Sequence, residues 1–94
     1  MSVAVTRTAT EPTLAFAVEV RDGRSSSRHT VTADPALVKR LAAGRSISDE
    51  RFVEAVFEFL LEREPKDAIL ARFDVSIVSR YFPEFEREIG KHLP

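Results

Sequence analysis

Apolar positions are densest over residues 52–61, where eight of ten residues are hydrophobic and the two exceptions are Glu54 and Glu58. In a helix, Glu54, Glu58 and Glu62 lie one turn apart and form a single polar stripe. A surface helix usually buries a face only a little over ~100° wide, so this one needs cover on most of its circumference. The pattern predicts a central, nearly all-apolar helix over 49–63.

Capping residues mark the starts of two helices. Ser48 is placed to accept a hydrogen bond from a backbone N–H in the first turn of the central helix, and Pro65 ends or kinks that helix. Asp34 followed by Pro35 marks the other start, because the missing N–H of proline costs nothing at the first helical position. Gly44 then supplies the stop. A short, well-bounded helix is therefore predicted before the central one.

Alternation of apolar and polar or small residues marks two strands in the first third of the chain. It runs over 14–21, stops at a polar stretch that opens with Asp22, and resumes over 28–33. A period of two with β-branched residues is typical of a half-buried strand, and a short polar connection joins adjacent antiparallel strands. The pattern predicts a β-hairpin over 14–33.

The two ends of the chain differ in pattern. Residues 1–13 are rich in Thr and Ala and are predicted to form a flexible arm, because termini fray unless they are tied down; the alternation of Val3 and Val5 leaves a short edge strand as the alternative. Residues 14–94 are predicted to form one small α+β domain, in which the hairpin is followed by four or five helices packed around the central one. The predicted helices lie at about 35–43, 49–63, 66–73, 75–82 and 84–92.

Composition narrows the class of protein. The chain has 94 residues, of which 44% are hydrophobic and 31% charged, as in an ordinary globular domain. Its 14 basic and 15 acidic residues give a net charge of −1, unlike a chain that binds by neutralising phosphates. The absence of cysteine excludes disulfides and thiolate metal sites. No apolar run resembles a secretory signal or a membrane span, so we expect a cytoplasmic protein without membrane contact.

Motifs that carry catalysis are missing. There is no glycine loop for phosphate, no dinucleotide fingerprint and no paired-histidine metal motif. His29 lies on the apolar side of its predicted strand and His92 lies near the C-terminus, and both are interpreted as structural residues. We therefore expect a non-enzymatic protein with no catalytic residues, no cofactor and no metal.

Two groups of side chains are candidates for an interaction surface. The glutamate stripe is either a solvated outer face or a docking strip for a basic partner, and hard divalent cations also favour carboxylates. The aromatic cluster near the C-terminus is either core or a recognition patch, because aromatics are enriched at interface hot spots. The candidate residues are Glu54, Glu58, Glu62, Tyr81, Phe82 and Phe85.

Residues 28–64 resemble the ribbon-helix-helix family of DNA-binding proteins. The resemblance rests on the strand over 28–32, the capped helix that starts at Asp34, and the apolar helix capped by Ser48. In that family two chains pair their strands into a ribbon that reads the major groove. The resemblance implies that three side chains would face bases, namely Arg28, Thr30 and Thr32.

Three functions follow from these patterns. The favoured one is a small interaction or adaptor module that acts as a homodimer and binds a protein partner, since pairing would cover the central helix. The alternative is a ribbon-helix-helix-type DNA-binding regulator, for which the resemblance is the support. The third is a small-ligand or metal-binding protein that uses the glutamate stripe or His29.

Overall fold

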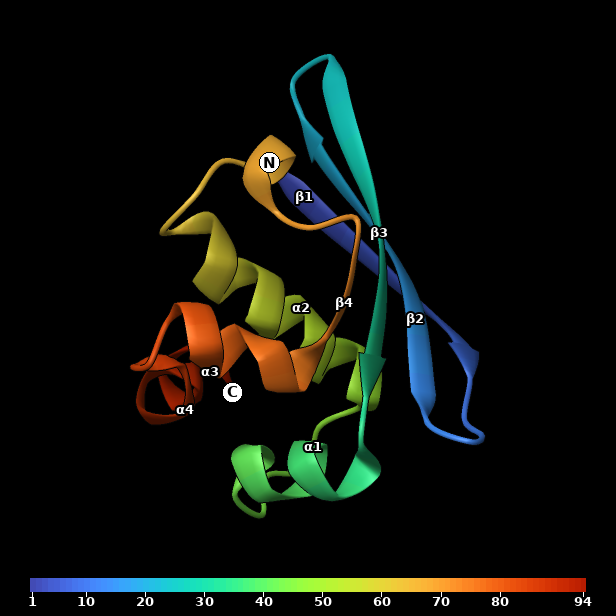
Figure 1. Cartoon of the computed structure of the whole chain (residues 1–94), viewed down its shortest axis with the longest axis vertical. Coiled ribbons are helices and arrows are strands. Elements are labelled where there is room, and N and C mark those ends of the chain that lie inside the picture. The colour runs from blue at the N-terminus through green and yellow to red at the C-terminus, as the bar shows by residue number, and fades with distance from the viewer.

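A four-stranded sheet forms one layer of the molecule, and the helices lie on one of its faces (Figure 1). A computed structural model describes residues 1–94. Strands β1 (Ser2–Ala9), β2 (Leu14–Asp22) and β3 (Ser25–Ala33) are antiparallel, and β4 (Arg72–Asp74) pairs parallel with β3. The α+β class and the N-terminal antiparallel hairpin are confirmed.

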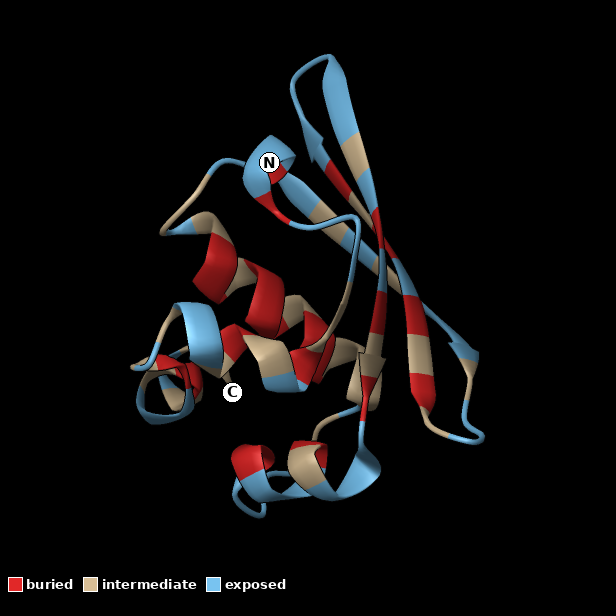
Figure 2. Ribbon diagram, viewed as in Figure 1, coloured by how far each residue is buried: buried red, intermediate tan, exposed pale blue.

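The β2–β3 hairpin follows the alternation in the sequence. Its strands pair without a register shift from Leu14 opposite Ala33 to Asp22 opposite Ser25. Gly23 has φ of 63°, a left-handed conformation that glycine adopts without steric cost at the turn. Every second residue is buried over 14–20 of β2 and 29–33 of β3, whereas the ends of both strands next to the turn are exposed (Figure 2). The inward residues are Leu14, Phe16, Val18, Val20, His29, Val31 and Ala33.

The prediction of a flexible arm over 1–13 is wrong for most of that segment, because β1 pairs along the free edge of β2. Val3 and Val5 are half-buried and pack against the core. Arg7 reaches the start of the central helix, where its Nη1 lies 3.2 Å from Oδ2 of Asp49. Two alternating valines are too few to predict a strand from sequence, because the strand forms only by pairing with β2.

Helix α2 (Asp49–Leu61) packs against the inner face of the sheet. Its N-cap is Ser48, whose side chain accepts a hydrogen bond from the Arg51 N–H at 3.0 Å. The charged residues of its first turn, together with Glu54 and Glu58, give the whole helix a polar side. Cover for the apolar side comes from within one chain. The buried residues of α2 are Phe52, Val53, Ala55, Val56, Phe57, Phe59 and Leu60.

The C-terminal third consists of shorter helical segments than predicted. The helix expected over 66–73 is wrong: residues 66–68 form one 3₁₀ turn and residues 72–74 form β4, which fills the remaining edge of β3. None of the helices combines the length and the apolar character that crossing a membrane requires. The remaining elements are α1 (Pro35–Ala42), η1 (Lys66–Ala68), η2 (Val75–Ile77), α3 (Val78–Tyr81), α4 (Phe85–Glu88) and η3 (Ile89–His92).

Helix α1 begins and ends at capping residues. Asp34 accepts a hydrogen bond from the Ala36 N–H at 2.8 Å, and Pro35 occupies the first turn. At the other end Ala43 has φ of 54° and ψ of 45°, and Gly44 has φ of 81°. A left-handed conformation is easy for Gly44, but for Ala43 it brings Cβ close to backbone oxygen. Ala43 is therefore a strained position outside the core.

Replacing Ala43 by glycine should stabilise the protein. Because Ala43 is exposed and already left-handed, Ala43→Gly is expected to raise the free energy of unfolding by about 1 kcal/mol. The matched control is Ala36→Gly in the same helix, which should lower it by up to about 1 kcal/mol. Urea denaturation measures both changes, and a destabilised Ala43→Gly protein would contradict the strain.

Candidate functional site

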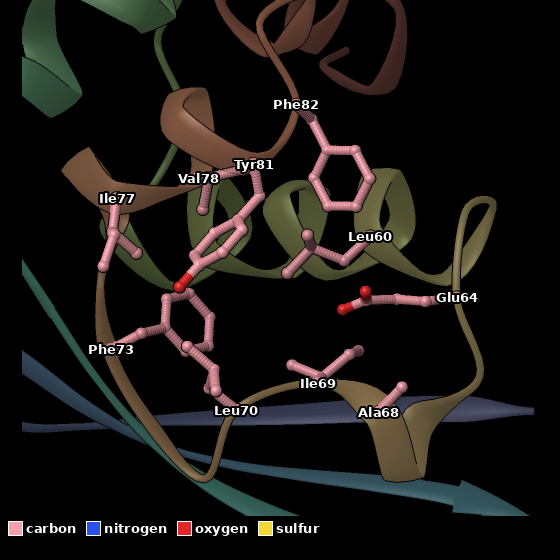
Figure 3. Close-up of a pocket in the computed structure, with 10 residues that line it drawn as sticks. All are labelled: Leu60, Glu64, Ala68, Ile69, Leu70, Phe73, Ile77, Val78, Tyr81 and Phe82. Carbon is pink, nitrogen blue, oxygen red and sulfur yellow. The ribbon is translucent and has the colours of Figure 1, made fainter.

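An apolar groove opens between the end of α2, the segment that follows it, and α3 (Figure 3). Its volume is about 290 Å³, and nine of the ten residues that line it are hydrophobic. The apolar groove is lined by Leu60, Glu64, Ala68, Ile69, Leu70, Phe73, Ile77, Val78, Tyr81 and Phe82.

The local sequence turns the chain around this groove. Pro65 prevents α2 from continuing, because proline disfavours a helical conformation in the residue before it. After η1, the chain is extended at Ile69 (φ −73°, ψ 134°) and runs into β4. Asp74 then caps η2 by accepting a hydrogen bond from the Ser76 N–H at 3.0 Å. This cap redirects the chain into α3, which forms the opposite wall.

Two large hydrophobic side chains of the groove are exposed. Leu70 is 48% exposed and Tyr81 is 63% exposed, and the one other large hydrophobic residue exposed to this degree is Met1. Single exposed apolar residues are ordinary on protein surfaces. Here both belong to one hollow whose lining is already apolar, and a continuous exposed apolar surface of this kind is typical of interaction sites.

Glu64 is the one charged residue of the groove. It is half-buried, and Figure 3 shows its carboxylate pointing into the groove between Ile69 and Leu60. Its side chain makes no hydrogen bond and no ion pair, because the neighbouring cations have other partners. Arg63 contacts Glu62 and Glu84, and Lys66 contacts Asp67.

His29 holds one wall of the groove in place. Its ring is buried beside Phe57, with ring centroids 5.2 Å apart. Nδ1 lies 2.8 Å from the Leu70 carbonyl oxygen, and since a carbonyl only accepts, Nδ1 carries the hydrogen. Nε2 lies 2.8 Å from Oγ of Ser27, which donates to it when the ring is neutral. His29 therefore ties the Leu70 backbone to β3.

Asp74 makes the second tie between β4 and β3. Its Oδ1 accepts a hydrogen bond from the Thr32 hydroxyl, while Oδ2 accepts from the Ser76 N–H. Burial raises the pKa of Asp74, but the hydrogen bonds from Thr32 and Ser76 outweigh burial and hold that pKa below its usual value. The carboxylate is therefore ionised in its structural role at neutral pH.

The glutamate stripe is paired within the chain. Nη1 of Arg51 lies 3.9 Å from Glu54 and 3.7 Å from Glu58, while Nε2 of His92 lies 3.1 Å from Glu62. Nη2 of Arg51 also donates to the His92 carbonyl at 2.9 Å. These contacts fasten the C-terminal segment to α2. No group of three or more His, Asp or Glu side chains is arranged to hold a metal ion.

The aromatic cluster divides between surface and core. Tyr81 and Phe82 line the groove, whereas Phe85 is 1% exposed and its ring lies 5.0 Å from that of Phe59. Of the two alternatives for the cluster, Phe85 is therefore core and does not belong to an interaction surface. No pattern in the sequence indicates that Leu70 and Glu64 share this site, since each belongs to a segment whose path is set by tertiary packing.

The residues proposed to face DNA lie on the outer face of the sheet. Arg28 and Thr30 are exposed there, and Thr30 is opposite Arg72 of β4. Thr32 is half-buried and donates to Asp74. Both edges of β3 are paired inside the chain, so a ribbon between two chains would need another strand. The ribbon-helix-helix function stays a prediction.

Removing the His29 hydrogen bonds should loosen the wall of the groove at Leu70. His29→Phe keeps a ring beside Phe57 but leaves the Leu70 carbonyl without its donor, which should lower the free energy of unfolding by about 1–3 kcal/mol. Hydrogen exchange of the Thr30 amide, which donates to the Ala71 carbonyl at 2.8 Å, should become faster.

The matched control is Ser27→Ala, which removes the outer hydrogen bond of His29 and keeps the one to Leu70. It should cost less than His29→Phe and leave Thr30 exchange nearly unchanged. Equal effects of the two substitutions on stability and exchange would contradict the positioning role of His29.

Comparison with known proteins gives this chain no family. No family model, no curated protein and no solved structure matches it. What the protein does is therefore inferred from its own residues and from the groove they form.

Proposed function

We propose that this protein is a non-enzymatic interaction module that binds an apolar segment of a protein partner in the groove. The observation that carries the proposal is the exposure of Leu70 and Tyr81 on a hollow with nine hydrophobic lining residues. Leaving this surface in water is unfavourable, and covering it with apolar side chains is favourable by roughly 25 cal/mol per Å².

The size of the groove favours a side chain of a partner over a free small molecule. Its volume of about 290 Å³ lies at the lower limit of the range for small-molecule pockets, which starts near ~300 Å³. Leu70 and Tyr81 extend the apolar surface beyond the hollow, so an occupant must cover more than the hollow itself. Tyrosine is also among the residues that contribute most to protein interfaces.

A selection of peptides tests this proposal. A displayed library of random 12-residue peptides, panned against the protein, should yield binders whose addition shifts the amide resonances of the groove. Tyr81→Ala should weaken these binders about tenfold or more, as expected for an aromatic interface anchor. The control is Thr30→Ala, which alters an exposed residue of the outer sheet face and should leave affinity unchanged.

Two outcomes would contradict the proposal. One is a selection in which no peptide binds above background. The other is a set of binders whose affinity is the same for the Tyr81→Ala and Leu70→Ala proteins as for the unaltered chain.

We also propose that the protein forms a homodimer, and the support for this comes from β1 and not from α2. Since α2 is covered within one chain, its apolar surface no longer calls for a second copy. The free edge of β1 now supports pairing, because eight residues without proline or lysine leave backbone donors and acceptors unpaired. The opposite edge of the sheet, β4, has three residues.

A dimer through β1 predicts a change with concentration. Light scattering coupled to size-exclusion chromatography should give about twice the chain mass of 10.6 kDa at high micromolar concentration, and the melting temperature should rise with concentration. Amide exchange within β1 should slow in parallel. A mass of 10.6 kDa at every concentration would contradict the dimer.

A further inference from the structure

The geometry points to the chemistry of the groove's occupant, and this inference rests on the proposed function. We propose that the partner segment carries a Lys or Arg beside a bulky apolar side chain. The apolar side chain fills the groove and the cation pairs with Glu64. The occupant is thus a basic–apolar segment of another protein.

The first support is the state of Glu64 itself. It is the single charged residue among the ten that line the groove, and its half-buried carboxylate points into the hollow (Figure 3). The backbone N–H of Glu64 is used, since it donates to the Leu60 carbonyl at 3.0 Å. The side chain makes no hydrogen bond and no ion pair within the chain.

The second support is that the nearby cations are committed elsewhere. Arg63 donates from Nε to Glu84 at 3.0 Å and from Nη1 to the Phe59 carbonyl at 3.1 Å. Its guanidinium carbon lies 3.6 Å from the centre of the Phe59 ring, a cation–π contact that fixes the side chain away from Glu64. Lys66 is buried, and its Nζ lies 3.1 Å from both carboxylate oxygens of Asp67.

The end of α2 adds to the negative potential at this place. Glu64 follows the C-terminus of α2, the end of a helix that carries partial negative charge. The last turn of α2 holds no basic residue, and the charge of Arg63 just beyond it is paired with Glu84 and Glu62. A cation brought by a partner would therefore interact favourably with both the carboxylate and the helix end.

Glu64 also acts against a purely apolar occupant. A ligand that covered the groove without a hydrogen-bond donor would desolvate the carboxylate and leave it unpaired. Burying an unpaired charge is strongly unfavourable. Glu64 thus selects among apolar segments by their charge. An acidic segment is excluded most strongly, because like charges would meet at short distance.

The test uses the peptides selected against the unaltered protein, with fluorescein-labelled synthetic 12-mers as probes. Basic residues should be enriched beside the apolar anchor. Glu64→Gln, which keeps the shape of the side chain, should weaken binding about tenfold at low salt, as expected for loss of a hydrogen bond to a charged group. Because Glu64 has no partner in the fold, its replacement should leave the melting temperature nearly unchanged.

The matched control is Glu11→Gln. Glu11 is exposed in the connection between β1 and β2, so this substitution removes one negative charge without touching the groove. It should leave peptide affinity unchanged. On the peptide side, replacing the basic residue by norleucine should weaken binding as much as Glu64→Gln does. The two changes together should cost little more than either alone.

The outcomes separate this inference from the proposed function. One outcome is a set of peptides that bind the groove and lose affinity for the Tyr81→Ala protein, but are not enriched in basic residues and bind the Glu64→Gln protein equally well. It would overturn the basic–apolar segment and leave the proposed interaction module intact. A selection that yields no groove-binding peptide would overturn both. Equal losses in Glu64→Gln and Glu11→Gln would also overturn the pairing, because they would reflect net charge alone.

Discussion

The packing of α2 against the inner face of the sheet is the constraint on which the rest of the molecule depends. Phe57 is a buried residue of this contact, with its ring 5.2 Å from that of His29 and 5.9 Å from that of Phe73. It therefore joins the helix to β3 and to β4 at once. Because β4 has three residues, its place is set by this packing and by the ties from His29 and Asp74.

The apolar groove is a consequence of how the chain leaves α2. Pro65 stops the helix, and the chain returns across the end of α2 to reach β3. The groove lies between this returning segment and α3. On one side its lining residues pack against the hydrophobic core, and on the other they are open to solvent. Buried side chains such as Ile69 and Val78 lie beside the exposed Leu70 and Tyr81. The groove is thus an unclosed part of the hydrophobic core.

The glutamates of α2 and of the segment that follows it differ in their ion-pair partners. Glu54 and Glu58 have Arg51 of the same helix within 4 Å, whereas Glu58 and Glu62 also contact His92 and so help to hold the C-terminal segment. Glu64 is two residues further on and has no such partner. In sequence Glu64 lies outside the stripe formed by the other three glutamates, and no pattern singles it out. In the fold the other three have partners within the chain, and Glu64 faces the groove without one.

The sequence by itself determined the elements whose signals are local: the hairpin over 14–33 and the helices capped by Asp34 and Ser48. Capping and alternation involve residues a few positions apart, so they can be read without knowing the fold. Strands β1 and β4 were missed because a strand exists through its partner, and Phe73 pairs with Val31 more than forty positions away. The exposure of Leu70 and Tyr81 and the burial of Phe85 were likewise decided by tertiary structure, since solvent access depends on which distant segments arrive beside a residue.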